Sequence, residues 1–219
     1  EAFRYGGEEF CLLFRDKMRE ALGRNDGRQP FDYTLMYLNN THGDGMNILP
    51  THRLLSKETC YGVDWPETLA ELAEDFIVEP LRIDHDDLPG EARRIARLLA
   101  ESGRLGPSFV LLLPKGQARL IRLRPEVDLN DLIDEDLPLD VKALDVTILH
   151  SSLINRHVLG NPEIELDDQD VTYVKDTAVA IEKLNCCKYG CAFLMNPTRI
   201  EQVTRIARLG MRMPHKSTY

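Results

Sequence analysis

The stretch TLMYLNNTHGDGMNILPTHRL, Thr34–Leu54, sets the expectation for how the rest of the chain folds. Two apolar runs in it, Thr34–Leu38 and Met46–Leu49, are rich in strand-forming residues. Between them lies His42-Gly43-Asp44-Gly45, whose residues tolerate the positive φ angles of tight turns. The pattern predicts a hairpin-like pair of strands with a polar exit at Thr51-His52-Arg53.

Outward from this stretch, helical and strand-like patterns alternate. Apolar residues at helical spacing predict helices at Glu8–Leu22, Asp64–Asp75, Leu88–Gly103, Val141–His157, Thr177–Leu184 and Pro197–Leu209, with Asp140 as an N-cap. Strands are expected at Phe76–Leu81, Phe109–Leu113, Ala118–Leu123, Val171–Val174 and Cys191–Met195. This order predicts an α+β fold, a mixed sheet with flanking helices. Residues 1–219 form one region, and the acidic connection Asp128–Asp140 is the best candidate for a subdomain boundary.

Composition excludes several classes of protein. The formal net charge of -9 argues against nucleic acid as a partner, because that binding depends on Lys and Arg neutralising phosphates. No apolar run approaches the roughly 18 residues that span a bilayer. Five cysteines, an odd number, fit a reducing compartment, so we expect a cytoplasmic protein. The chain opens at Glu1 without Met, which indicates that it is incomplete at its N-terminus.

The triplet Thr51-His52-Arg53 carries the most chemistry. A hydroxyl, an imidazole and a guanidinium just past a strand suit phosphate or carboxylate binding and proton transfer. The alternative is a buried polar cluster that satisfies the backbone of a loop.

Two later segments offer further polar groups. Asn196-Pro197-Thr198 precedes a predicted helix whose first N–H groups could face an anion, or Asn196 or Thr198 could simply cap that helix. Lys216-Ser217-Thr218 is similar to the end of a phosphate loop but lacks its glycine spacing, and a mobile basic tail is the alternative. Cys186, Cys187 and Cys191 lack a second ligand pair, so no metal site is predicted.

Several of these stretches together resemble one family. Asn39-Asn40, Ile48–Arg53, Leu149-His150, Phe193–Thr198 and Met213–Tyr219 match, in order and spacing, the C-terminal two-thirds of the domain of unknown function 1015 family. Members carry an Asp-Gly-His-His-Arg motif before their first helix, reminiscent of the phosphate-binding motif of ParB-like and sulfiredoxin-like proteins. In this sequence the motif is expected near Tyr5-Gly6-Gly7 and is not there.

The resemblance implies a phosphate- or nucleotide-handling enzyme, a small-molecule kinase-like phosphotransferase, with a phosphorylated metabolite or nucleotide as partner and Mg²⁺-nucleotide as cofactor. In this hypothesis His52 is the catalytic base. The ligand-binding residues are Thr51, Arg53, Asn196, Thr198, Lys216, Ser217 and Thr218. The alternative is a non-catalytic ligand-sensing or scaffold protein. The enzyme hypothesis requires His52, Arg53, Asn196 and Lys216 to converge on one open pocket.

Overall fold

The computed structural model describes residues 17–23, 29, 48–162, 164, 166–167, 169–186 and 188–214. The chain divides into two compact units, Glu1–Met46 and Asn47–Tyr219. In the first unit, residues 17–22 are helical, within the predicted helix Glu8–Leu22. The predicted strand Thr34–Leu38 and the turn after it lie outside the described residues. Residues 48–50 are not in a strand.

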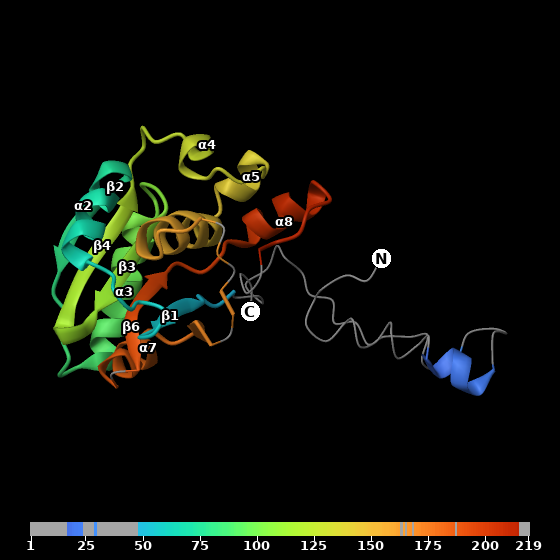
Figure 1. Cartoon of the computed structure of the whole chain (residues 1–219), viewed down its shortest axis with the longest axis horizontal. Helices are drawn as coiled ribbons and strands as arrows, with labels where there is room; N and C mark the ends of the chain where they lie inside the picture. The colour runs from blue at the N-terminus through green and yellow to red at the C-terminus, as the bar shows by residue number, and fades with distance from the viewer. Residues whose placement is uncertain are drawn as a thin grey trace. The chain divides into compact units, whose positions relative to one another are not determined.

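Six strands form one sheet in the described part of the second unit, in the order β2-β4-β3-β6-β1-β5 (Figure 1). Their bounds are β1 (His52–Ser56), β2 (Phe76–Leu81), β3 (Ser108–Leu113), β4 (Gln117–Leu123), β5 (Val171–Val174) and β6 (Tyr189–Met195). The predicted α+β class is confirmed. The predicted mixed sheet is wrong, because all the pairings described are antiparallel.

Three of the helices that the sequence pattern predicts begin where an aspartate caps the first turn. They are α2 (Trp65–Asp75), α3 (Leu88–Ser102) and α7 (Thr177–Asn185). The carboxylates of Asp64, Asp87 and Asp176 accept hydrogen bonds from backbone N–H groups three residues later, at 3.2, 3.0 and 3.0 Å. Such caps satisfy N–H groups that a helix itself leaves without a partner.

The predicted helix Val141–His157 is wrong in its continuity. The structure has two short helices, α5 (Leu139–Lys142) and α6 (Asp145–Thr147), followed by the π-helix η3 (Ile148–Val158). Extended backbone at Leu144, with ψ of 133°, separates α5 from α6. Asp140 is not an N-cap, because it lies inside α5 and forms an ion pair with Arg205.

Two more elements lie beside these. Helix α4 (Leu129–Leu132) occupies the acidic connection, and α8 (Ile200–Arg208) follows β6. The predicted start of the latter at Pro197 is wrong by three residues, because Arg199 is the N-cap and its backbone N–H donates to Gln202 Oε1 at 2.9 Å. The boundary predicted at Asp128–Asp140 stays a prediction.

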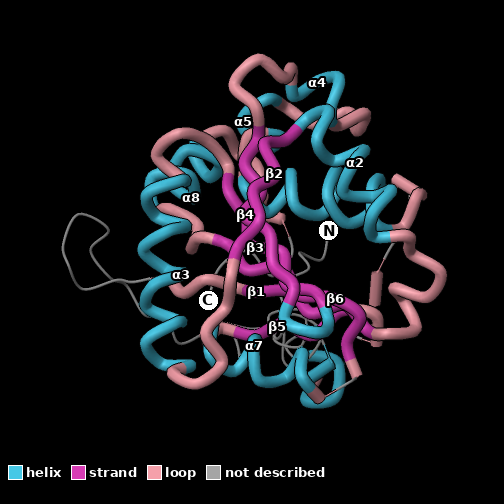
Figure 2. The backbone as a smooth tube through the Cα atoms, turned by 90° about the vertical axis from the view of Figure 1, so that its left-hand side faces the viewer, coloured by secondary structure: helices cyan, strands magenta, loops and turns pink. Residues whose placement is uncertain are grey.

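Helices cover both faces of the sheet, which Figure 2 shows edge-on between α3 and α2. On one face, which we call the α7 face, Leu54, Val110 and Leu194 pack with α3 and α7. On the other, the η3 face, Leu111 and Phe193 pack with α2 and η3. Among the described residues, no helix is long and apolar enough to cross a membrane.

Candidate functional site

His52 and Arg53 are adjacent in β1 and therefore point to opposite faces of the sheet. The triplet that the sequence placed just past a strand is instead the start of one. Side chains alternate between the two faces along a strand, so His52 projects to the α7 face and Arg53 to the η3 face. These two residues cannot converge on one pocket, which was the requirement of the predicted enzyme mechanism.

Both ring nitrogens of His52 have hydrogen-bond partners on the α7 face. Its side chain is buried, its Nδ1 accepts from Met195 N–H at 3.3 Å, and its Nε2 lies 2.9 Å from Thr177 Oγ1. Because Nδ1 is an acceptor, the proton is on Nε2 and is donated to Thr177. Burial, and then the adjacent Arg53 guanidinium, lower the pKa of His52 to about 4. This neutral imidazole ties β1 to α7 and β6.

Arg53 is the largest fully buried side chain on the η3 face. Its Nε donates to His150 Nε2 at 3.1 Å, and its Nη1 contacts the Thr51 carbonyl oxygen and, at 2.7 Å, Met195 Sδ. The guanidinium also lies over the Tyr173 ring, 5.6 Å from its centroid. Arginine is the cation best suited to burial with several planar contacts. It links β1, β5, β6 and η3.

A cavity of about 500 Å³, which we call the η3 cavity, opens on the other side of two of these partners. His150 and Tyr173, both in contact with Arg53, line it. Its polar lining also includes Glu135, Thr147, Ser151, Asn155 and Arg212. Leu137, Val141, Val146, Ile164 and Leu166 supply an apolar wall. Small-molecule sites have this size and this mixture of apolar wall and few polar groups.

Two polar atoms of the η3 cavity lack a hydrogen-bond partner among the described residues. Thr147 Oγ1 is buried and unpaired, and so is Asn155 Oδ1. The Asn155 amide is oriented by its Nδ2, which donates to the carbonyl oxygens of Pro162 and Ile164 at 3.4 and 3.1 Å. Buried polar groups nearly always have partners, so each atom would gain a hydrogen bond if its side chain turned toward a ligand in the cavity.

The π-helix is the element that brings His150, Ser151 and Asn155 to the cavity. Its wider turn buries Leu149, Leu153 and Val158, at intervals of four and five residues. Helices of this kind are rare and are often found at functional sites. The Ser151 hydroxyl donates to Glu135 Oε1 at 2.5 Å and so joins the helix to the cavity's acidic side.

Of the other predicted site residues, the structure describes Thr51, whose carbonyl oxygen contacts Arg53, and Asn196 and Thr198, which follow β6. Asn196 lies between β6 and α8, where its Nδ2 donates to the Leu99 carbonyl oxygen at the end of α3, at 2.8 Å. Thr198 is half-buried and lines none of the cavities described. Lys216, Ser217 and Thr218 lie outside the described residues, although Pro214, shortly before them, lines the η3 cavity.

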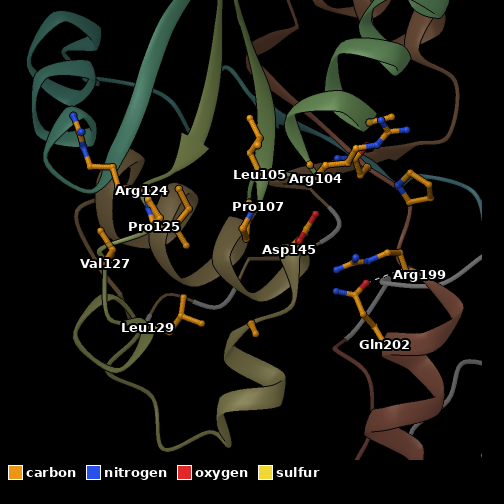
Figure 3. A pocket seen from close by; sticks show the side chains of 17 residues that line it. Arg104, Leu105, Pro107, Arg124, Pro125, Val127, Leu129, Asp145, Arg199 and Gln202 are labelled. Carbon is orange, nitrogen blue, oxygen red and sulfur yellow. Dashed lines mark hydrogen bonds between the residues drawn. The ribbon is translucent and has the colours of Figure 1, made fainter.

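Asn196 lines a second cavity, of about 690 Å³, which we call the α8 cavity. Figure 3 shows Arg199 reaching from the start of α8 toward the side where Asp145 lies. Burial raises the pKa of Asp145 to about 6, and Arg199 opposes this shift. Arg124 turns away from the cavity, since its guanidinium donates to the Ala73 carbonyl oxygen.

Helix α6 separates the two cavities. Asp145 lines the α8 cavity, whereas Val146 and Thr147 line the η3 cavity. Sequence reasoning missed Asp145, Tyr173 and Arg212, because each stands alone in the sequence and only the fold brings it to a cavity. The extended residue Leu144, which breaks the helix before α6, has no Gly or Pro beside it, so the sequence does not indicate this break.

The described residues include no group of three or more His, Cys, Asp or Glu side chains placed to hold a metal ion.

Residues 9–147 match the model of the family described as "Protein of unknown function (DUF1015)". This match covers more than half of the chain. The chain belongs to this family. The match includes β1 to β4 and ends at Thr147, the last residue of α6, so η3, β5 and β6 follow it. Comparisons with curated proteins and with solved structures found no match.

Proposed function

We propose that the chain binds a phosphorylated small metabolite or a nucleotide in the η3 cavity. The observation that carries the proposal is the buried Arg53, whose guanidinium contacts two residues of the cavity lining, His150 and Tyr173. A guanidinium in a low-dielectric interior produces a strong local positive potential. Arg212 adds a second cation on the lining itself. Arginine is the side chain most often used to recognise phosphate.

The remaining lining fits the rest of such a ligand. Once turned toward the cavity, Thr147 Oγ1 can donate to a phosphate oxygen, and Asn155 Oδ1 can accept from an N–H or O–H group. A sugar hydroxyl or a base amine supplies that donor. The apolar wall, including Val146 and Leu166, gives a base or carbon skeleton a surface to pack against. Mg²⁺ would accompany a bound nucleotide.

The finer proposal is a kinase-like phosphotransferase, and its base is not His52. Both ring nitrogens of His52 have partners, and it faces away from the η3 cavity. Phosphoryl transfer depends on positioning, electrostatic stabilisation and a residue that accepts the acceptor's proton. Glu135, which already accepts from the Ser151 hydroxyl, is the carboxylate that can take this role.

A non-catalytic ligand-sensing function is the second candidate. The observation that favours it is the Arg53–His150 hydrogen bond, which occupies the basic Nε2 of the only histidine among the described residues that line the η3 cavity. An imidazole held in this way orients a ligand but does not take a proton from it. Cytoplasmic location belongs to the same proposal, supported by the free thiols of Cys60, Cys186 and Cys191.

Thermal unfolding with inorganic phosphate, ADP, Mg²⁺-ATP and a set of sugar phosphates tests the binding proposal. A ligand at one hundred times its dissociation constant stabilises the folded chain by about 2.7 kcal/mol. For a chain of this size that corresponds to roughly 5 to 11 °C in Tm. Thr147→Val removes the unpaired hydroxyl while keeping its volume, and Arg212→Gln removes the lining cation. Both variants should reduce the shift.

Arg208→Gln is the matched control, since Arg208 is exposed in the last turn of α8 and lines neither cavity. The proposal fails if no phosphorylated compound raises Tm, or if Thr147→Val and Arg212→Gln leave the shift unchanged. Glu135→Gln then separates the two candidate functions. The phosphotransferase loses turnover and keeps binding, whereas a sensing protein shows no turnover in either form.

A further inference from the structure

The α8 cavity holds a carboxylate that no described side chain pairs closely. Asp145 has no hydrogen bond or ion pair from another described side chain, and it is half-buried. The charged side chain that acts on it is Arg199, which reaches toward it from the start of α8 (Figure 3). A carboxylate withdrawn from water in this way is strongly favoured by an added cation.

The lining of the same cavity also has cations. Arg199 and Arg104 both line it, and Arg104 is exposed near the start of the α3–β3 connection. One atom of each neighbouring amide is already hydrogen-bonded. Asn196 Nδ2 donates to the Leu99 carbonyl oxygen, and Gln202 Oε1 accepts from the Arg199 backbone N–H. The charged groups left to meet a ligand are therefore one carboxylate and two guanidinium groups.

Another part of the lining is apolar. Leu105, Pro125, Val127 and Leu129 line the cavity on the side away from α8. A volume of about 690 Å³ is ample for a ligand with a large apolar body. Charge and surface together specify three features of the occupant, namely a cation, an anion and an apolar group.

We propose that the α8 cavity binds an amino acid with a large apolar side chain, its ammonium at Asp145, its carboxylate at Arg199 and its side chain against Leu105 and Val127. The ammonium pairs with the half-buried Asp145 carboxylate, and the guanidinium can hold the ligand's carboxylate through two parallel hydrogen bonds. This site is distinct from the η3 cavity, and α6 separates the two.

Calorimetric titration of the chain with L-phenylalanine and L-leucine, up to about 10 mM, tests the inference. Asp145→Asn and Arg199→Gln should each weaken binding at least tenfold. Asp131→Asn and Arg208→Gln are the matched controls, because both residues are exposed and neither lines the cavity, so their affinities should equal that of the unaltered chain. Circular dichroism confirms that each variant is folded.

The ligand's own chemistry gives a second readout that does not depend on the variants. N-acetyl-L-phenylalanine lacks the ammonium and L-phenylalaninamide lacks the carboxylate, so both should bind at least tenfold more weakly. The inference is overturned if neither amino acid binds, if Asp145→Asn and Arg199→Gln bind as tightly as the controls, or if N-acetylphenylalanine binds as well as phenylalanine. None of these measurements uses a phosphorylated compound, so the result is independent of the η3 cavity.

Discussion

The two faces of the sheet treat neighbouring polar residues in opposite ways. On the α7 face, His52 is buried with both ring nitrogens paired, and apolar side chains close over it. On the η3 face, Arg53 is buried next to a cavity whose lining includes unpaired polar atoms. His52 stabilises the fold alone, whereas Arg53 also contacts two residues that line a space in which a ligand fits. Ligand binding is therefore expected on the η3 face.

The largest effect is expected from Arg53→Gln. The variant loses a buried cation, leaves His150 Nε2 and the Thr51 carbonyl oxygen without their donor, and opens space in the core. We expect the free energy of unfolding to fall by about 3 to 5 kcal/mol. Urea unfolding at pH 7 measures it. A loss below about 1 kcal/mol would mean that Arg53 does not hold the η3 face together.

His52 gives the next largest effect, through pH. Its folded pKa, about 4, lies below the unfolded value of 6.5, so the unfolded chain takes up this proton first. The stability that neutral His52 provides is complete above pH 6.5 and is lost as pH falls toward 4. The loss across this window is about 3 kcal/mol.

His52→Gln should lack this part of the pH dependence. Comparing urea unfolding of the variant and the unaltered chain at pH 7 and pH 4.5 isolates it, since other groups titrate equally in both. Asp145 would otherwise mask part of the effect. Its raised pKa means that acid stabilises the folded form as pH falls through 6. Parallel pH profiles for the two proteins would contradict the burial of a neutral imidazole.

Two buried serines provide the smallest and most closely matched contrast. Ser108, on the α7 face, shares a hydrogen bond with Ser102 at 2.8 Å and donates to the Gly106 carbonyl oxygen at 2.8 Å. Ser152, in η3, is equally buried, and its Oγ has no partner among the described residues. Ser108→Ala should cost about 1 kcal/mol, whereas Ser152→Ala should be neutral or stabilising by a few tenths. If the two variants lost equal amounts of unfolding free energy, the two faces would not differ in how they stabilise buried hydroxyl groups.

Much of the fold could be predicted from periodicity and capping. Leu88–Ser102 follows an aspartate cap and ends before Gly103, and the hairpin of β3 and β4 follows from two apolar runs around Pro114–Gly116. The errors arose where no residue type marks the change. Leu144 is extended without a Gly or Pro, so Val141–His157 looked like one helix.

Individual residues of the candidate site could be predicted from the sequence, but their arrangement in space could not. The sequence singled out Arg53 for phosphate binding, but it placed Thr51-His52-Arg53 in a loop, where neighbouring side chains can converge. Because these residues start a strand, alternation separates His52 from Arg53. Tyr173 and Arg212 carry no local signal, since their role depends on the strand register and on the chain path after α8.

The most direct test of the account follows the two histidines by NMR. Imidazole resonances of His52 and His150 are recorded while inorganic phosphate or ADP is titrated into the chain, with Arg212→Gln as the comparison. We expect the His150 signals to move with ligand, the His52 signals to stay in place, and Arg212→Gln to reduce the movement. Movement of His52 while His150 stays in place would put the ligand on the α7 face and contradict the account.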